Sequence, residues 1–115
     1  MKYIFEVKIK QGYTAEEYAI AWKRGSEVIQ KMPGARGTRL YRKIGDPNTL
    51  LAIAEWKSKE ARDKAMTKLE SSDEKTKEII HKHRGFGEFV RIGEYEDAEW
   101  EVISLINNSS MLASG

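Results

Sequence analysis

The sequence predicts an α+β protein with a ferredoxin-like fold, in which a four-stranded antiparallel sheet carries helices on one face. Segments with strand periodicity and with helix periodicity follow one another in the order strand, helix, strand, strand, helix, strand. A turn-rich stretch, Gly45-Asp46-Pro47-Asn48, joins the two middle strands as a hairpin. Right-handed crossovers then place both helical regions on the same face of the sheet.

The first part of the chain holds a strand and an amphipathic helix. Residues 2–10 alternate between the two faces of a strand. Thr14 and Glu17 have the spacing of a capping box at a helix start. Met32-Pro33-Gly34 ends this helix, because the residue before a proline avoids the helical region. The helix presents one apolar stripe, made of Tyr18, Trp22, Gly25, Ile29 and Met32.

The middle of the chain predicts two more strands, over residues 38–44 and 50–56. Ser58 supplies the cap of a helix that continues to Leu69. Ser71-Ser72-Asp73 interrupts the helical region, and Asp73 is expected to cap a further helix.

That further helix is expected to run to about Arg84, with Gly85 as the residue just beyond its end. Residues 86–96 alternate again and predict the fourth strand. Residues 1–97 therefore form one domain. Residues 98–106 are too apolar to stay in water and are expected to be a fifth strand or an arm laid on a partner, whereas residues 107–115 are expected to form a mobile tail.

Composition narrows the functional classes. The chain has no cysteine, which excludes disulfides and thiolate metal sites. Its 20 basic and 18 acidic residues are interleaved, which speaks against nucleic-acid binding because such proteins show a one-sided basic patch. No apolar run approaches the roughly 20 residues that span a membrane, and the N-terminus lacks a signal-peptide core. We therefore expect a cytoplasmic protein that contacts no membrane.

Both faces of the predicted sheet carry apolar side chains on every strand. One layer of helices covers only one of these faces. A monomer rarely leaves more than a few hundred Å² of contiguous apolar surface exposed. A second copy related by two-fold symmetry is the simplest cover, so the sequence predicts a homodimer.

Several segments resemble the antibiotic biosynthesis monooxygenase-like family, which belongs to the dimeric α+β barrel superfamily. They are Met32-Pro33-Gly34-Ala35-Arg36-Gly37, Tyr41-Arg42, the Asp46-Pro47 turn and Glu55-Trp56-Lys57-Ser58-Lys59-Glu60-Ala61. The resemblance covers roughly residues 1 to 97. It implies a dimeric barrel that binds a small aromatic molecule or oxygenates it without a cofactor, since such a substrate supplies its own electrons once deprotonated. The alternative is a non-catalytic, stress-associated or ligand-sensing dimer.

Six side chains are candidates for a site in such a protein. Tyr41 or His83 would accept a proton from a phenolic substrate, and an arginine would hold the developing anion. The candidates for ligand binding are Trp22, Trp56, Arg39 and Arg91. Structural roles stay open for all of them: the tryptophans can fill the core, and the strand residues can form cross-strand pairs.

A second resemblance concerns enzymes that bind heme. Trp56-Lys57-Ser58-Lys59 and His81-Lys82-His83 are similar to segments of the heme-degrading monooxygenases. The resemblance would make His81 the ligand. Ala65 stands where those enzymes have a functional tryptophan, and Val7 stands where they have an asparagine. Heme binding or degradation is therefore a minor alternative.

The helical phase separates the two histidines. His81 is expected on the polar face of its helix and His83 on the apolar stripe with Ile79 and Ile80. If heme binds, His83 is the better ligand on physical grounds. Because a His-x-His pair on a helix points its two rings to different sides, we predict no metal site.

Overall fold

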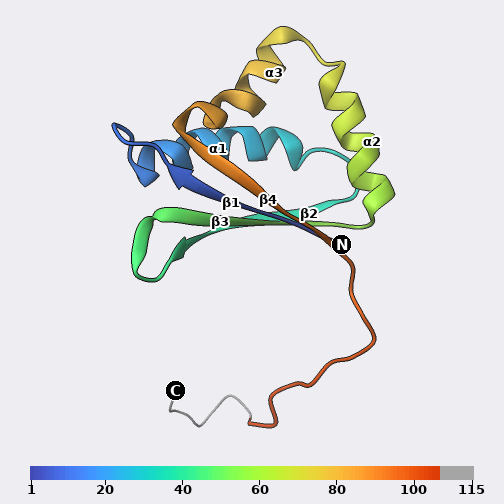
Figure 1. Ribbon diagram of the computed structural model, residues 1–115. Coiled ribbons are helices and arrows are strands. Elements are labelled where there is room, and N and C mark those ends of the chain that lie inside the picture. The colour runs from blue at the N-terminus through green and yellow to red at the C-terminus, as the bar shows by residue number, and fades with distance from the viewer. Residues whose placement is uncertain (107–115) are drawn as a thin grey trace.

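A four-stranded antiparallel sheet with the strand order β2-β3-β1-β4 forms the base of the molecule in the computed structural model, which describes residues 1–106 (Figure 1). Its strands are β1 (Lys2–Ile9), β2 (Ala35–Lys43), β3 (Asp46–Trp56) and β4 (Gly87–Tyr95). The helices are α1 (Ala15–Ile29), α2 (Lys59–Glu70), α3 (Glu74–His81) and the 3-10 helix η1 (Lys82–Phe86). All of them lie on one face of the sheet (Figure 1). The ferredoxin-like prediction is confirmed.

The predicted helix caps are confirmed. The Thr14 hydroxyl accepts the Glu17 N–H at 3.1 Å, and the Glu17 carboxylate accepts the Thr14 N–H at 2.8 Å. Ser58 and Asp73 each accept the N–H of the residue three positions later, at 3.1 and 2.7 Å. A cap of this kind stabilises a protein by about 1 kcal/mol. The caps therefore fix where each of these helices begins.

The hairpin between β2 and β3 is tighter than the sequence predicts. Lys43 pairs with Asp46, so Ile44 and Gly45 alone form the turn. Gly45 has a φ of +89°, which glycine adopts without strain. The turn predicted over residues 45–48 is therefore wrong. The observed turn lies at residues 44–45, and β3 begins at Asp46 instead of at residue 50.

The end of the third helix also differs from its prediction. The α-helix stops at His81, and the chain tightens into η1, which contains Gly85. Gly85 does not have a positive φ, so its predicted role as the residue after a helix end is wrong. The Phe86 carbonyl accepts the Lys10 N–H at 2.9 Å, which ties the end of η1 to the loop after β1.

The core lies between α1 and the centre of the sheet. Val7 and Tyr18 are fully buried there, next to Leu50. Gly25 permits close approach of α1 and α3, because a Cβ at this position would lie 3.2 Å from the Ile80 Cα. We call this side of the sheet the covered face.

The opposite side of the sheet is apolar and has no helix over it. From the strand register, Ile4, Tyr41, Leu51, Ile53 and Val90 point to this side. Tyr41 and Val90 are 45% and 60% exposed. We call this side the open face.

Residues 98–106 form no strand in the single chain. They run away from the end of β4 and lie clear of the domain (Figure 1). Trp100, Val102 and Leu105 are 82%, 97% and 94% exposed. The arm therefore stays a prediction, and the predicted tail, residues 107–115, lies outside the described residues. Within residues 1–106, none of the helices has both the length and the apolar character needed to cross a membrane.

Candidate functional site

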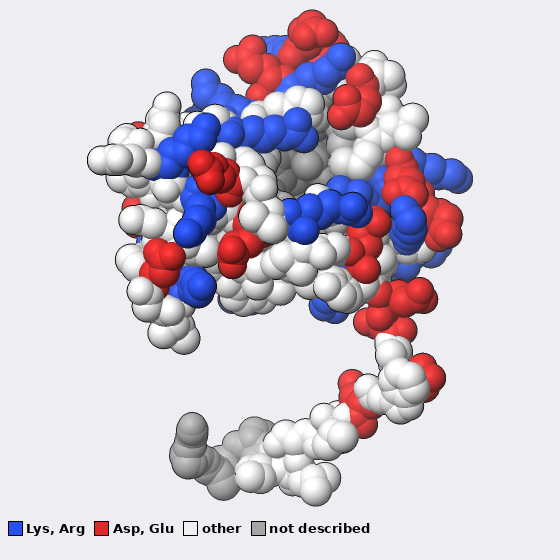
Figure 2. Space-filling view, in the orientation of Figure 1, with Lys and Arg blue, Asp and Glu red and all other residues white. Residues whose placement is uncertain are grey.

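A cavity of about 420 Å³ opens between the covered face and the helices α1, α2 and α3. Its volume falls in the range of small-molecule sites. Seen from outside, the molecule is hollowed here, with basic side chains on the rim (Figure 2). Its aromatic walls are Tyr3, Phe5, Trp22, Trp56 and Phe89, and its charged or titratable side chains are Arg62, Glu70, His81, His83, Arg84 and Arg91.

The aromatic side chains of β1 and β4 form a row along the cavity. Tyr3 and Phe5 have ring centroids 6.0 Å apart, and Phe5 and Phe89 are 5.7 Å apart. The His83 ring meets Phe89 edge to face at 5.5 Å and ends the row. Tyr3 and Phe5 share a face because residues two apart on a strand point to the same side. Phe89 joins them because β4 pairs with β1. A flat apolar ligand fits such a wall.

His83 is held in an apolar environment that keeps it neutral. Its ring lies edge-on to Tyr18 at a centroid distance of 5.5 Å. Burial lowers the pKa of His83 to about 4, and the neighbouring charges of Arg84 and His81 add to this effect. Its buried Nδ1 has no hydrogen-bond partner among the described residues. The cavity wall therefore includes an imidazole that is neutral at pH 7.

Tyr18 lies under His83 in the core and is unsuited to give up its proton. Its hydroxyl is buried without a partner in the described part of the chain. Burial raises the pKa of Tyr18 well above its usual range. Tyr18 does not border the cavity, so its contact with His83 is a packing contact.

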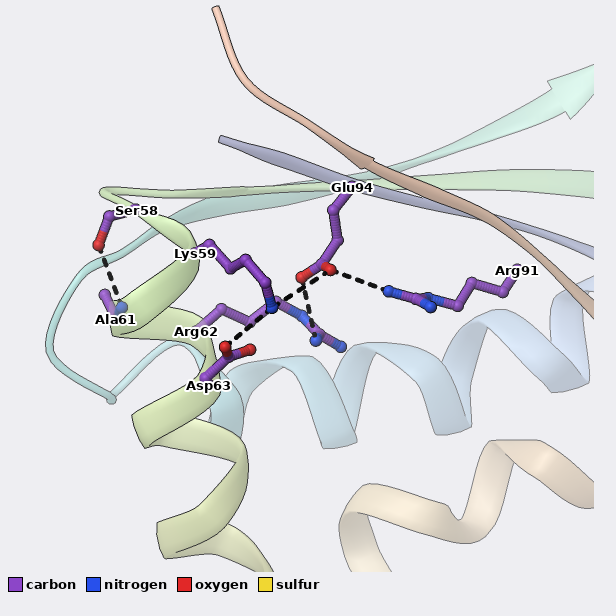
Figure 3. Close-up of polar contacts among 7 residues, drawn as sticks. All are labelled: Ser58, Lys59, Ala61, Arg62, Asp63, Arg91 and Glu94. Carbon is purple, nitrogen blue, oxygen red and sulfur yellow. Dashed lines mark hydrogen bonds and ion pairs between the residues drawn. The ribbon is translucent and has the colours of Figure 1, made fainter.

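A cluster of basic side chains surrounds Glu94 at the opposite end of the aromatic row (Figure 3). The carboxylate of Glu94 lies 2.9 Å from Arg91, 3.6 Å from Lys59 and 3.7 Å from Arg62. The Arg62 guanidinium stacks 3.8 Å from the Tyr3 ring centroid. Arg62 and Arg91 both border the cavity, and we call them the arginine pair.

Sequence reasoning missed Arg62 and Glu94. Arg62 is three and four residues before Ala65 and Met66, on the inward face of α2, and that spacing could have identified it. Glu94 gave no such signal. A register shift between β4 and β1 lies at Ile4 and Phe5, and it turns Glu94 toward the covered face opposite Tyr3.

The structure brings four of the six candidate side chains together and leaves two apart. His83, Trp22, Trp56 and Arg91 all border the cavity. Tyr41 and Arg39 point away from it, because strand alternation turns their β2 neighbours toward the helices. The Arg39 guanidinium lies 5.8 Å from the Tyr41 ring, beside a separate groove between α1 and β2. Of the two alternative proton acceptors, the single chain therefore places His83 at the cavity and Tyr41 outside it.

His81 also differs from its expectation. It borders the cavity instead of lying on a solvated face, and its Nε2 is 3.9 Å from a Glu70 carboxylate oxygen. His81 ends α3 and faces Glu70 at the end of α2, so a neighbouring helix lies on the side that the sequence assigned to solvent.

Val7 and Ala65, the positions compared with heme-degrading enzymes, are buried and do not border the cavity. In the described part of the chain, no three His, Asp or Glu residues are grouped as a metal site would need.

Comparison with known proteins identifies a family and several solved structures that this chain resembles. The model of the antibiotic biosynthesis monooxygenase family matches residues 2–71. No curated protein sequence matches this chain.

Among solved structures, a mutant of SnoaB, a cofactor-independent oxygenase from Streptomyces nogalater, is similar with a TM-score of 0.65 and 15% identity, over 86% of this chain and 96% of that one. The protein At3g17210 from Arabidopsis thaliana has a TM-score of 0.65 and 14% identity, over 88% and 98%. A putative antibiotic biosynthesis monooxygenase from Nitrosomonas europaea has a TM-score of 0.58 and 14% identity, over 83% and 98%. At these identities the likeness concerns the fold.

Proposed function

Since the chain belongs to the antibiotic biosynthesis monooxygenase family, we propose that its cavity binds a small aromatic molecule and oxygenates it without a cofactor. One observation carries this proposal: a neutral imidazole, His83, and several guanidinium groups converge on a space with aromatic walls. A core-filling role for Trp22 and Trp56 alone would leave no such space. The cavity therefore favours a ligand-binding function over a purely structural one.

The proposed reaction begins with a proton transfer. The substrate is a phenol with an activated CH₂ group, and His83 accepts a proton from it. The resulting imidazolium is stabilised by the substrate anion beside it, and Arg84, on the same cavity wall, stabilises that anion. Burial disfavours the charged form of His83. The substrate anion offsets this cost, because an opposite charge nearby favours the imidazolium.

Molecular oxygen is the co-reactant and the substrate supplies all the electrons. The anion gives one electron to O₂, and the two radicals combine to a peroxide that takes up the proton held by His83. The hydroperoxide then loses water, so the CH₂ group becomes a carbonyl: R₂CH₂ + O₂ → R₂C=O + H₂O. One oxygen atom enters the product and the other leaves in water.

The proposed assembly is a cytoplasmic homodimer that stacks two open faces against each other. Support comes from the apolar side chains of the open face, among them Ile53 at the centre of the sheet. Residues 98–106 would lie on the partner, since five large apolar side chains are exposed there in the single chain. Burying such side chains is the main gain available to a dimer.

The test of the reaction uses 1,8-dihydroxyanthrone, a phenol with an activated CH₂ group, and follows O₂ uptake and the absorbance of the quinone. We expect the purified protein to accelerate both over buffer, and His83→Gln to lower the rate about 100-fold. Tyr41→Phe, a change outside the cavity, should keep the rate.

Binding of the anthrone without O₂ uptake would overturn the enzymatic part and favour the ligand-sensing dimer. A Soret shift on adding heme that is lost in His83→Ala would favour the heme alternative. Absence of both binding and turnover would contradict the proposed function as a whole.

A further inference from the structure

We propose that the ligand of this cavity carries a carboxylate, which binds between Arg62 and Arg91 at the Tyr3 end of the aromatic row. This inference rests on the proposed function and deepens it by naming the substrate class. The ligand would be an aromatic carboxylate whose reacting group reaches His83 at the other end of the row.

The first support is the convergence of two guanidinium groups on one ring. The Arg62 guanidinium carbon lies 3.8 Å from the Tyr3 ring centroid, and that of Arg91 lies 5.6 Å from it. Both side chains border the cavity, although they come from α2 and β4. Guanidinium groups are the donors that proteins use most for carboxylates, because each can give two parallel hydrogen bonds to the two carboxylate oxygens.

The second support is the charge balance of the cluster. Glu94 is the one carboxylate within ion-pair distance of the arginine pair in residues 1–106, whereas Lys59 also has Asp63 at 2.9 Å. Arg62 and Arg91 therefore share a single negative charge. Glu70 also borders the cavity, but its contact is with His81 at 3.9 Å. One positive charge of the pair is left for a ligand.

The third support is an unused donor. The contact of Arg62 with Glu94 is 3.7 Å, longer than a hydrogen bond, and the buried Arg62 Nε has no partner among the described residues. A buried donor without an acceptor is costly unless something satisfies it. The Arg62 side chain is 17% exposed and that of Arg91 is 59% exposed, so a carboxylate between them would enter from solvent past Arg91 and reach Arg62.

Glu94 does not border the cavity and acts as a positioning residue. It holds Arg91 by a hydrogen bond of 2.9 Å and pairs with Arg62 at 3.7 Å (Figure 3). These contacts keep both guanidiniums near Tyr3. Phe5 and Phe89 lie between the arginine pair and His83. The aromatic ring of a ligand that spans these two ends would stack against Phe5 and Phe89. The carboxylate sets the orientation, and the body brings the reacting group to His83.

The experiment compares 2-naphthoate with its neutral analogue 2-naphthamide by isothermal titration calorimetry at constant ionic strength. We expect the full-length protein to bind 2-naphthoate at least about tenfold more tightly, the value of one charge-assisted hydrogen bond. Arg91→Gln and Arg62→Gln should each remove most of this preference. Lys59→Gln is the matched control, because it removes a cation that contacts the same Glu94 but does not border the cavity. This variant should keep the preference.

The outcomes separate the two proposals. Equal affinity for both compounds would overturn the carboxylate inference and leave the aromatic cavity standing. If neither compound binds, the proposed function and the inference both fail. If Lys59→Gln loses the preference as fully as Arg91→Gln, general surface charge explains it and the arginine pair does not. Arg62→Gln also removes the stacking on Tyr3, so the exposed Arg91 provides the cleaner variant.

Discussion

The two faces of the sheet are built from the same alternating strands, yet the polar groups on them differ in how deeply they are buried. On the open face, Lys2 and Glu55 are register partners on neighbouring strands and form an ion pair of 3.2 Å. On the covered face, polar atoms of His83 and Arg62 are buried without hydrogen-bond partners among the described residues. The covered face thus holds buried polar atoms that no other described residue satisfies.

This difference shows which face suits chemistry and which suits assembly. Buried polar groups without partners cost free energy, and native proteins usually keep them only where a ligand or a function uses them. The open face carries a row of apolar side chains and needs only a complementary surface. This difference supports the proposals that a ligand binds on the covered face and that a dimer forms through the open face.

The largest expected effect comes from placing a charge in the open face. Ile53→Asp would bury an unpaired carboxylate in each half of the dimer, at a cost of at least about 3 kcal/mol, or about a hundredfold in the dissociation constant. Ile44→Asp is the matched control, because Ile44 is 100% exposed at the hairpin turn. In sedimentation equilibrium at micromolar concentration, we expect Ile53→Asp to be monomeric and Ile44→Asp to be dimeric. A wild-type monomer, or an unaffected Ile53→Asp dimer, would contradict the assignment of the open face.

An intermediate effect is expected from the pH dependence of stability. The pKa of His83 is lowered from 6.5 to about 4 in the folded protein, so the unfolded chain binds a proton at a pH where the folded one does not. The free energy of unfolding should therefore fall as the pH decreases from 6.5 toward 4. Because His83 is partly exposed, we expect this loss to be about 2 kcal/mol.

The measurement is urea denaturation at pH 7 and pH 4.5 for the wild type and His83→Gln. The variant lacks the titrating group, so its unfolding free energy should fall less over this interval. All other groups titrate in both proteins and cancel in the difference. Equal losses in the two proteins would mean that His83 is not held neutral on the covered face.

The smallest expected effect compares the same substitution on the two faces. Glu94→Gln removes the charge that holds the partly buried Arg62, and it should destabilise the protein by about 1 kcal/mol. Glu55→Gln removes an ion pair whose side chains are 42% and 49% exposed, and should cost less than about 0.5 kcal/mol. Both are best measured in the Ile53→Asp background, which removes the contribution of the dimer. Equal costs would remove the contrast between the two faces.

The elements were predictable because their signals are local. Capping side chains at Thr14, Ser58 and Asp73 and the change of period from strand to helix identify starts and types of elements within a few residues. The hairpin turn and the end of α3 were misplaced. A tight two-residue turn and a switch to a 3-10 helix depend on how neighbouring segments pair, which a single stretch of sequence does not contain.

The site was only partly predictable, for the same reason. His83 was identified from the apolar stripe of its helix, and Trp22 from that of α1. Tyr41 was a plausible acid–base group by residue type, but the alternation of β2 turns it away from the cavity. Glu94 could not be found, since its direction depends on a register shift between the first and the last strand of the sheet in chain order.

The most direct test of the central claim, that the covered face encloses a binding site for aromatic molecules, uses the tryptophans of the chain. Of its three tryptophans, Trp22 and Trp56 border the cavity and Trp100 lies on the exposed C-terminal segment. In Trp100→Phe, all tryptophan fluorescence comes from the cavity walls. We predict that titration with 4-nitrophenol quenches this fluorescence to a saturating limit, beyond the quenching of free N-acetyltryptophanamide. Quenching that never saturates, or that disappears together with Trp100, would contradict the account.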